Sequence, residues 1–357
     1  MDGKKNILVF TDSMGNAGIQ RVLSELTSSW VRKGHKITIA YIKKTENKEN
    51  DFHWNQSIKF IEIPVKHNNI LIYFDLFKEY IHILKQNPNS IAISLSVMTN
   101  FVLGACGPFV KNKIIISDRN DPTMRPKGRV KQFIRNLVFR QADTLVFQTE
   151  DVQKYYQKKI RRDGVIIPNP INPNLPEPYT GLRRQTIVTA SRLNKQKNLG
   201  VLLKAFSYFS KDYPNYFLEI FGRGEEEENL KKLSRKLGIE NKVKFKGFSN
   251  EIYNQIKDCA IYVCSSDYEG ISNSLIEALG LGLPCISTDC PVGGSRLLID
   301  NNENGILINV GDYKDLYVQM KKIVESPNLS EKLSKNAVKV RDRFNVDKIA
   351  QMWIDSM

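Results

Sequence analysis

The segment IPNPINPNLPEP, residues 167–178, places five prolines in twelve positions near the middle of the chain. Proline fixes φ and lacks a backbone donor, so this segment can form neither a regular helix nor a central strand. A chain of 357 residues is also longer than one ordinary domain. We therefore predict domains at residues 1–170 and 179–343, a proline-rich linker at 171–178, and a C-terminal helix, 344–357, that packs back on the N-terminal domain.

Short apolar strands alternate with helical segments on both sides of this linker. Before it, we expect strands at residues 6–10, 35–42, 59–63, 91–95, 113–116, 144–148 and 165–167. After it, we expect strands at 186–190, 217–221, 243–246, 260–264, 285–288 and 305–308. The expected helices there are 198–210, 225–237, 250–257, 273–281, 312–325, 329–343 and 346–356. This alternation predicts parallel sheets covered by helices on both faces.

The expected fold is therefore α/β, with two doubly wound Rossmann-like domains facing a deep cleft. Ligands of such sheets bind beyond the carboxyl ends of the strands. One uncharged stretch, residues 91–110, has the length of a membrane span, but Ser94, Asn100, Gly104 and Pro108 lower its hydropathy. We expect a buried strand, a polar turn and a short packed helix there.

The net charge of +15 is concentrated in the first half of the chain. Residues 1–178 hold 27 basic and 16 acidic residues, a net charge of +11. Much of the excess lies in the stretch 124–143, where cations alternate with apolar residues. Such a stretch fits either contact with an anionic membrane surface or a solvated helix face. No nucleic-acid-binding module is visible, so nucleic acid is not an expected partner.

The cysteines and the N-terminus favour a cytoplasmic location, with peripheral contact at the inner face of the cell membrane. The five cysteines form no C-x-x-C pair, which is typical of buried, reduced thiols. Lys4 and Lys5 lead directly into an apolar strand, and we expect no signal peptide.

Several strand-to-helix loops carry residues suited to a nucleotide diphosphate. Gly18 follows the first strand, where a helix start could receive an anion or simply form a turn. The sequence TASRLNKQKN places Arg192 and Lys197 between a strand and a helix that Asn198 could cap. Two cations at the carboxyl edge of a sheet suit a diphosphate, although ordinary surface cations would look the same. Four glutamates at 225–228 indicate an acidic helix start.

The segment SSDYEGISNSLIEALGLGLP, residues 265–284, contains two glutamates eight positions apart. Glu269 would project from a loop, and Glu277 would lie about one turn inside the following helix. The four residues from Ser274 to Glu277 match the capping box S-x-x-E, so Glu277 is either part of a cap or a ligand-binding residue.

Taken together, these motifs resemble the retaining glycosyltransferases of family 4, which have the GT-B fold. The resemblance rests on SRLNKQKN, IFGRGEEEENL, VKFKGF, EGISNSLIEALGLGLPCISTD and NGILINVGD, in this order over the second domain. It implies catalytic roles for Arg192 and Lys197 at the diphosphate and for Glu269 at the donor sugar, while Glu277 would hold the ribose. Further donor contacts are implied for Gly18, Gly222, Gly247, Phe248, Gly270, Ile271 and Ser272.

The first domain departs from the family pattern. The family's Gly-Gly pair is Ala17-Gly18 here, and none of the four histidines lies in the family's histidine motif. The sequence SDRNDP stands instead at a strand end, where a subgroup active in bacterial surface-polysaccharide assembly has Ser-Glu-Arg-Asn. Asp118, Arg119 and Asn120 are therefore candidates for the acceptor or sugar side, although Asp121 and Pro122 could simply set a turn.

The resemblance implies a retaining transfer from a nucleotide diphosphate sugar, which we expect to be UDP-linked, to a glycan or lipid-linked acceptor. No Asp-x-Asp motif occurs, and we expect neither a metal nor another cofactor. Two alternatives remain: a nucleotide-sugar epimerase on the same fold, and a non-catalytic sugar-binding partner subunit.

Overall fold

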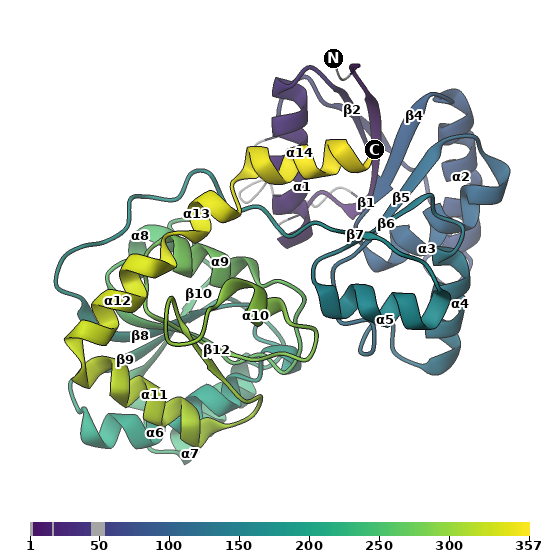
Figure 1. Ribbon diagram of the computed structural model, residues 1–357. Coiled ribbons are helices and arrows are strands. Elements are labelled where there is room, and N and C mark those ends of the chain that lie inside the picture. Colours follow the sequence, from purple (N-terminus) through teal and green to yellow (C-terminus); the bar gives the residue numbers. More distant parts are fainter. Residues whose placement is uncertain (1–2, 16–17, 44–53) are drawn as a thin grey trace. The chain divides into compact units, whose positions relative to one another are not determined.

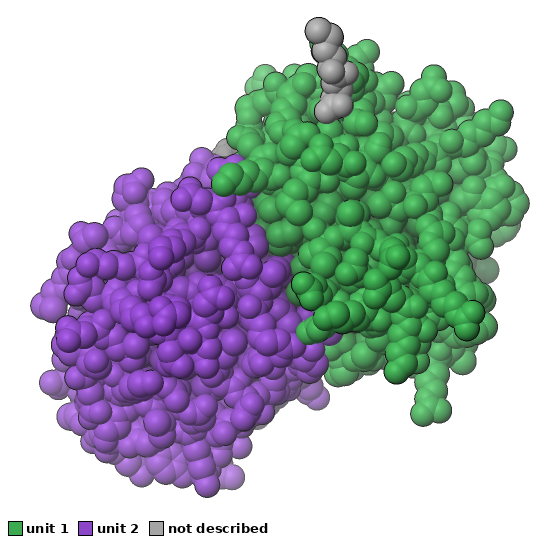
Figure 2. Space-filling view, in the orientation of Figure 1, with its two compact units in different colours: residues 1–170, 346–357 green, residues 171–345 purple. Residues whose placement is uncertain are grey.

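The computed structural model of this chain describes residues 3–15, 18–43 and 54–357. The chain divides into two compact units, which are coloured separately in Figure 2. Unit 1 comprises Met1–Pro170 and Val346–Met357, and unit 2 comprises Ile171–Asn345.

Unit 1 is built on a parallel sheet with the strand order β3-β2-β1-β4-β5-β6-β7. The order reverses between β1 and β4, which makes their carboxyl ends the switch point of a doubly wound sheet. The strands are β1 Asn6–Ser13, β2 Lys36–Lys43, β3 Lys59–Glu62, β4 Ser90–Ser94, β5 Lys113–Asp118, β6 Thr144–Phe147 and β7 Val165–Ile166. The sequence predicted all seven, with ends that differ by three residues or fewer.

Helices cover the sheet of unit 1 (Figure 1). They are α1 Gly18–Arg32, α2 Ile72–Gln86, α3 Val97–Cys106, α4 Arg129–Phe139, α5 Glu150–Ile160 and α14 Val346–Ser356, with a short 3-10 turn η2 at Gly107–Phe109. The uncharged stretch 91–110 thus forms most of β4, α3 and η2. Within the described residues, no helix is both long and apolar enough to cross a membrane.

Helix α14 lies beside α1 although more than 300 residues separate Trp30 from Ala350 (Figure 1). The Trp30 indole donates a hydrogen bond to the Ala350 carbonyl at 3.1 Å, and the Trp30 and Trp353 rings meet edge to face with centroids 6.2 Å apart. Both tryptophans are fully buried in one apolar cluster of unit 1. Burial of two large aromatic surfaces holds the last helix of the chain on unit 1.

Unit 2 repeats the architecture with the strand order β10-β9-β8-β11-β12-β13 and parallel pairing throughout. The reversal now falls between β8 and β11. The strands are β8 Arg184–Ala190, β9 Phe217–Phe221, β10 Val243–Gly247, β11 Cys259–Cys264, β12 Cys285–Thr288 and β13 Ile306–Ile308. Two parallel doubly wound sheets confirm the predicted α/β fold class.

The helices of unit 2 agree with the expected ones except for one additional short helix and a break near the end of the unit. They are α6 Leu199–Asp212, α7 Glu227–Lys236, α8 Ile252–Ile256, α9 Asn273–Gly280, α10 Gly294–Leu298, α11 Tyr313–Glu325, α12 Pro327–Ala337 and α13 Val340–Arg343, with 3-10 turns η3 Lys195–Lys197 and η4 Glu240–Lys242. Glu227 and Glu228 occupy the first turn of α7, which confirms the acidic helix start. The single helix expected at 329–343 is instead α12 followed by α13, and α10 was not predicted.

The proline-rich segment 171–178 is not a free linker, because it belongs to unit 2. Ile171 and Leu175 are buried in an apolar cluster of that unit. The Ile171 N–H donates to the Phe344 carbonyl at 2.8 Å, and the Arg341 guanidinium donates to the Pro176 carbonyl. The prolines exclude regular structure, as predicted, but the apolar residues between them still pack on the core.

Candidate active site

Two loops of unit 2 that follow neighbouring strands are joined by polar contacts. The loop after β8 carries Lys197, and the loop after β11 carries Glu269. The Asp267 N–H donates to the Gln196 carbonyl at 2.9 Å, and the Gln196 side chain donates to the Tyr268 carbonyl at 2.8 Å. These bonds fix the relative position of the two loops at the carboxyl edge of the sheet, where ligands of such folds bind.

Lys197 and Glu269 form an ion pair at this edge. Their side chains are only 11% and 13% exposed, and the Ser266 hydroxyl donates to the same carboxylate at 3.0 Å. Burial lowers the pKa of Lys197, but the Glu269 carboxylate counteracts this effect, and the net pKa lies above its usual value. Lys197 is therefore a protonated cation at neutral pH, in a site largely removed from water.

Arg192 lies near this pair but is exposed to solvent. Its charge opposes the protonation of Lys197, and it forms no ion pair with any residue that the structure describes. Arg192 and Lys197 thus occupy one loop, with Lys197 paired and Arg192 available to a ligand. Asn198 is the N-cap residue of α6, but its side chain makes no capping hydrogen bond, because its backbone is left-handed and its side chain donates to Asp267 at 2.6 Å instead.

The glycines near these loops allow backbone segments to approach each other closely. A Cβ on Gly222 would lie 1.8 Å from the Ser191 carbonyl oxygen, and one on Gly294 would lie 1.6 Å from that of Gly270. The Gly222 N–H also donates to the Gly247 carbonyl at 2.8 Å. Any side chain at Gly222 or Gly294 would force the loops apart. Phe248, next to Gly247, is largely exposed.

Helix α9 begins at Asn273, shortly after Glu269 and Gly270. Its N-cap is Ser272, whose side chain makes no capping hydrogen bond. Ser274 is already inside the helix, so the capping-box interpretation of Ser274 and Glu277 is wrong. Ile271 is buried in the core of unit 2, which leaves its backbone as the part able to meet a ligand. The N-terminal turn of α9 offers backbone N–H groups and the positive end of a helix dipole.

Glu277 occupies the second turn of α9 and is half-buried. Burial, with smaller contributions that include the Glu277 carboxylate, raises the pKa of Tyr262 well above its usual value. The Tyr262 hydroxyl donates to the Ala190 carbonyl, at the end of β8, at 3.2 Å. Glu277 therefore lies close to the strand end from which the Arg192 and Lys197 loop departs.

In unit 1, Gly18 is the first residue of α1, at the switch point of the sheet, and it is exposed. Ala17 lies outside the described residues. The Gln20 side chain donates to the Ser13 carbonyl at 3.1 Å and thereby ties the start of α1 to the end of β1.

Asp118 and Arg119 are both buried at the end of β5. Asp118 accepts a hydrogen bond from the Tyr156 hydroxyl, and burial raises the pKa of Asp118. Its side chain is therefore engaged inside unit 1. Asn120 is half-buried, and its N–H donates to the Asp118 carboxylate at 3.3 Å. The turn expected at Asp121 and Pro122 is present, since the Met124 N–H donates to the Asp121 carbonyl at 3.1 Å.

Arg119 is a buried cation that has no carboxylate partner among the described residues. Its guanidinium donates to Ser117 and Asn169, and it stacks over Trp353 with 5.4 Å between the guanidinium carbon and the ring centroid. One nitrogen, Nη2, is buried without a partner. Burial lowers the pKa of Arg119 to about 9. No motif in the sequence pointed to Asn169 or Trp353, which are distant from Arg119 along the chain.

A known protein family is similar in sequence to most of unit 2. Residues 179–340 match the glycosyl transferases group 1 family. An uncharacterized glycosyltransferase of Haemophilus influenzae is 26% identical, over 98% of this chain and 99% of its own length. The Campylobacter jejuni enzyme N-acetylgalactosamine-N,N'-diacetylbacillosaminyl-diphospho-undecaprenol 4-alpha-N-acetylgalactosaminyltransferase is 25% identical, over 96% of both chains.

Solved glycosyltransferase structures share the fold of the whole chain. Anabaena Alr3699/HepE in complex with UDP superposes with a TM-score of 0.81 and 17% identity, over 98% of this chain and 99% of that one. These comparisons show the GT-B fold and support a glycosyltransferase family. Arg192, Lys197, Glu269 and Glu277 all lie inside the segment that matches group 1 glycosyl transferases.

Proposed function

We propose that this protein is a retaining, metal-independent glycosyltransferase of family 4. It moves a sugar from a UDP-linked donor, as a hexosyl or N-acetylhexosaminyl group, to a glycan or lipid-linked acceptor in cell-surface polysaccharide synthesis. The observation that carries the proposal is the buried Lys197–Glu269 pair beside Arg192, at the ligand-binding edge of the matched unit.

The donor would lie along the carboxyl edge of unit 2. Arg192 and Lys197 would bind the diphosphate, because two cations match its charge in a site with little water. Glu269 would exchange its bond to Lys197 for the hydroxyls of the donor sugar. Glu277 would accept hydrogen bonds from the ribose hydroxyls.

Backbone groups would complete the donor site. The N–H groups around Gly270, Ile271 and Ser272, at the start of α9, would hold the distal phosphate. The tight packing at Gly222 would keep the adjoining loops in place, and the backbone of Gly247 with Phe248 would meet the base. Gly18, at the start of α1, would supply a further phosphate contact.

In the reaction, the bond between the anomeric carbon and the diphosphate oxygen breaks, and UDP leaves. The acceptor hydroxyl oxygen bonds to the same face of that carbon, and its proton passes to the departing diphosphate oxygen. Arg192, Lys197 and the start of α9 would stabilise the charge that develops on the diphosphate, which is the usual contribution of preorganised donors. Positioning would supply the rest of the acceleration.

The acceptor would be met on unit 1, with Arg119 and Asn120 as contacts and Asp118 as their support. The Campylobacter jejuni relative is named for a diphospho-undecaprenol substrate, and a lipid-linked acceptor is the corresponding proposal here. The first half of the chain carries excess positive charge, which would attract the protein to the inner, anionic face of the cell membrane.

A donor screen by thermal unfolding tests the proposal, since a ligand that binds only the folded state raises its stability by mass action. UDP and UDP-N-acetylhexosamines should raise the unfolding midpoint, and GDP should raise it less. With a saccharide acceptor, the product should keep the donor's anomeric configuration, and EDTA should not lower the rate. Conversion of the donor without acceptor would identify an epimerase, and binding without any turnover would identify a non-catalytic sugar-binding subunit.

A further inference from the structure

Helix α4 of unit 1 turns a stripe of apolar side chains toward solvent. Four large apolar residues at helical spacing form a single stripe along it, which we call the α4 stripe. Their exposed fractions are 72% for Val130, 63% for Phe133, 45% for Ile134 and 45% for Leu137. A surface helix of a globular protein normally buries such a stripe against the core. Exposed apolar surface of this kind marks a site of interaction.

A buried arginine fixes this orientation. Arg135 is fully buried on the opposite side of α4 and donates to the carbonyls of Pro122 and Arg125 at 2.7 and 2.9 Å. It also donates to the Tyr155 hydroxyl at 3.0 Å. Rotating the stripe inward would break these charge-assisted bonds and leave a buried cation with fewer partners, which is costly. The outward stripe is therefore a stable property of unit 1.

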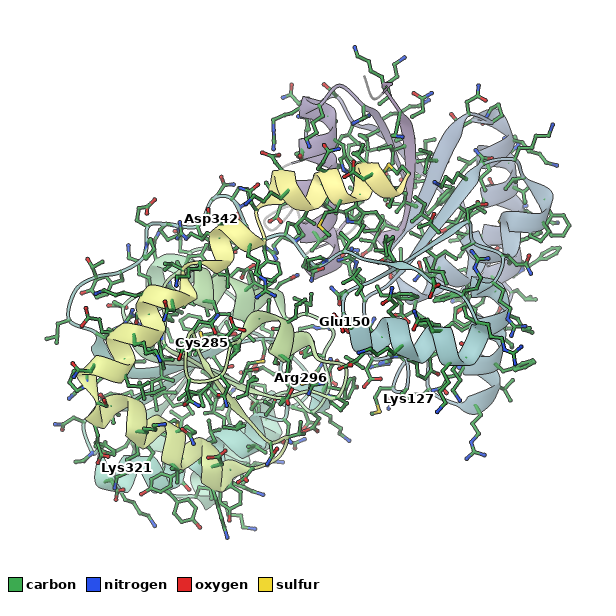
Figure 3. The ribbon with its side chains drawn as sticks, viewed as in Figure 1. Lys127, Glu150, Cys285, Arg296, Lys321 and Asp342 are labelled. Carbon is green, nitrogen blue, oxygen red and sulfur yellow. The ribbon has the colours of Figure 1, made fainter. Side chains whose placement is uncertain are left out.

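Cations surround the α4 stripe. With about 100° of rotation per residue, Arg129 and Lys131 lie about 100° to either side of Val130. The whole rim consists of Arg125, Lys127, Arg129, Lys131 and Arg140, all of them exposed. Lys127 lies on the loop that precedes α4 (Figure 3). Residues 122–142 contain no aspartate or glutamate, and within the described residues none of these five side chains forms an ion pair.

We infer that the α4 stripe and its basic rim form a docking face for an anionic lipid bilayer. The stripe would enter the boundary between headgroups and acyl chains, and the rim would contact lipid phosphates. This face rests on the proposed function, since a lipid-linked acceptor must be met at a bilayer. A second copy of the chain fits less well, because a twofold contact would oppose one basic rim to another. Nucleic acid would leave the apolar stripe without a partner.

Co-sedimentation of the full-length protein with vesicles tests this face. Vesicles of phosphatidylglycerol and phosphatidylcholine should bind the protein, and vesicles of phosphatidylcholine alone should bind it at least tenfold more weakly. Binding should weaken as salt rises, because the contact is partly electrostatic. The double variants Phe133→Ser/Ile134→Ser and Arg129→Gln/Lys131→Gln should each lose at least tenfold in apparent affinity.

Two exposed apolar residues elsewhere provide matched controls. Leu182 in unit 2 is 95% exposed, and Phe74 on α2 is 57% exposed. Leu182→Ser and Phe74→Ser should bind vesicles like the wild type. Unchanged unfolding midpoints for all variants establish that they are folded. Equal binding by the wild type and both α4 double variants would overturn the proposal. So would light scattering that shows a dimer converted to a monomer by Phe133→Ser/Ile134→Ser while vesicle binding is unchanged.

The same variants separate this inference from the proposed function. The α4 residues are remote in sequence from the matched segment, so stabilisation by UDP should be the same in wild type and variants. A wild-type protein that is stabilised by UDP but ignores anionic vesicles would overturn the docking face alone. A protein that binds vesicles but no nucleotide sugar would overturn the proposed donor site alone.

Discussion

Units 1 and 2 have the same doubly wound architecture. They differ in the partners of the cations at the carboxyl edges of their sheets. At the carboxyl edge of unit 2, Lys197 is already paired with Glu269, and the two loops that carry them are joined through Gln196. At the corresponding edge of unit 1, the buried Arg119 has neutral partners and one nitrogen without any. Under the proposed function, the pair in unit 2 would receive the donor, whereas Arg119 in unit 1 would be completed by the acceptor.

The largest expected effect concerns Lys197, in the proposed donor site of unit 2. Lys197→Ala removes one diphosphate cation, and we expect turnover to fall by about a hundredfold, the cost of one transition-state donor. It also leaves the Glu269 carboxylate largely buried without its cation, so the unfolding midpoint should fall. Steady-state transfer assays measure the first effect, and thermal unfolding the second.

Lys195 provides the control for Lys197, because it lies in the same 3-10 turn and is exposed. Lys195→Ala should keep turnover within about twofold of the wild type, as expected for a surface charge without a built partner. If Lys197→Ala were as active as Lys195→Ala, the assignment of the diphosphate site to the β8 loop would be wrong.

The second prediction concerns Glu277, for which two roles were open in the sequence. Because Ser272 is the N-cap residue of α9 and Ser274 lies inside the helix, Glu277→Gln should not lose a helix cap. We expect the unfolding midpoint to stay unchanged and the affinity for UDP to fall by about tenfold or more, as for a lost hydrogen bond to a charged group. Isothermal titration with UDP measures the affinity.

The exposed Glu228 at the start of α7 serves as the control for Glu277. Glu228→Gln should bind UDP like the wild type. A lower unfolding midpoint for Glu277→Gln with unchanged UDP affinity would show that this glutamate is structural.

Unit 2 also shows which features could be predicted from the sequence and which could not. Strand ends such as those of β9 and β12 were predicted to the residue, because continuous apolar runs identify buried parallel strands. The capping box at Ser274 was wrong, and Asn198 occupies the N-cap position of α6 without a side-chain capping bond. Hydroxyl and amide side chains choose among several partners that only the folded loops bring near. Asn198 found Asp267, 69 residues away.

The same limit applies to unit 1. Nothing in the sequence joins Arg119 to Asn169 or Trp353, which reach it through the ends of β7 and α14. Nor did it show that α4 buries Arg135 and exposes Phe133, since helical periodicity gives a stripe but not the direction in which it points.

The third prediction concerns Arg119, the buried cation of unit 1 whose Nη2 has no hydrogen-bond partner among the described residues. Burial depresses the pKa of Arg119, so the unfolded chain holds the proton more tightly than the folded one, and the charge costs stability below a pH of about 9. Arg119→Met should therefore keep or raise the unfolding midpoint at pH 7. It should lower the rate of transfer by about tenfold, the effect of one contact to a charged group, without changing UDP affinity.

Arg119→Lys separates charge from shape in this pocket. Lysine keeps the charge but cannot reproduce the planar fork of the guanidinium. A transfer rate between those of the wild type and Arg119→Met would support acceptor binding through that fork. An unfolding midpoint that falls in Arg119→Met, together with unchanged transfer, would instead make Arg119 a structural residue that binds Asn169 and Trp353.

The smallest expected effect concerns Phe248, which is exposed beside Gly247 at the edge of unit 2. An aromatic ring can stack on a nucleobase, and its removal weakens such a contact by about 1 kcal/mol, or about fivefold in affinity. Phe248→Ala should therefore weaken UDP binding by about fivefold. Phe217→Ala should not weaken it, because Phe217 begins β9 at the opposite edge of the sheet. Equal UDP affinities in the two variants would place the base elsewhere. The proposed donor site would then contact only the ribose and the diphosphate.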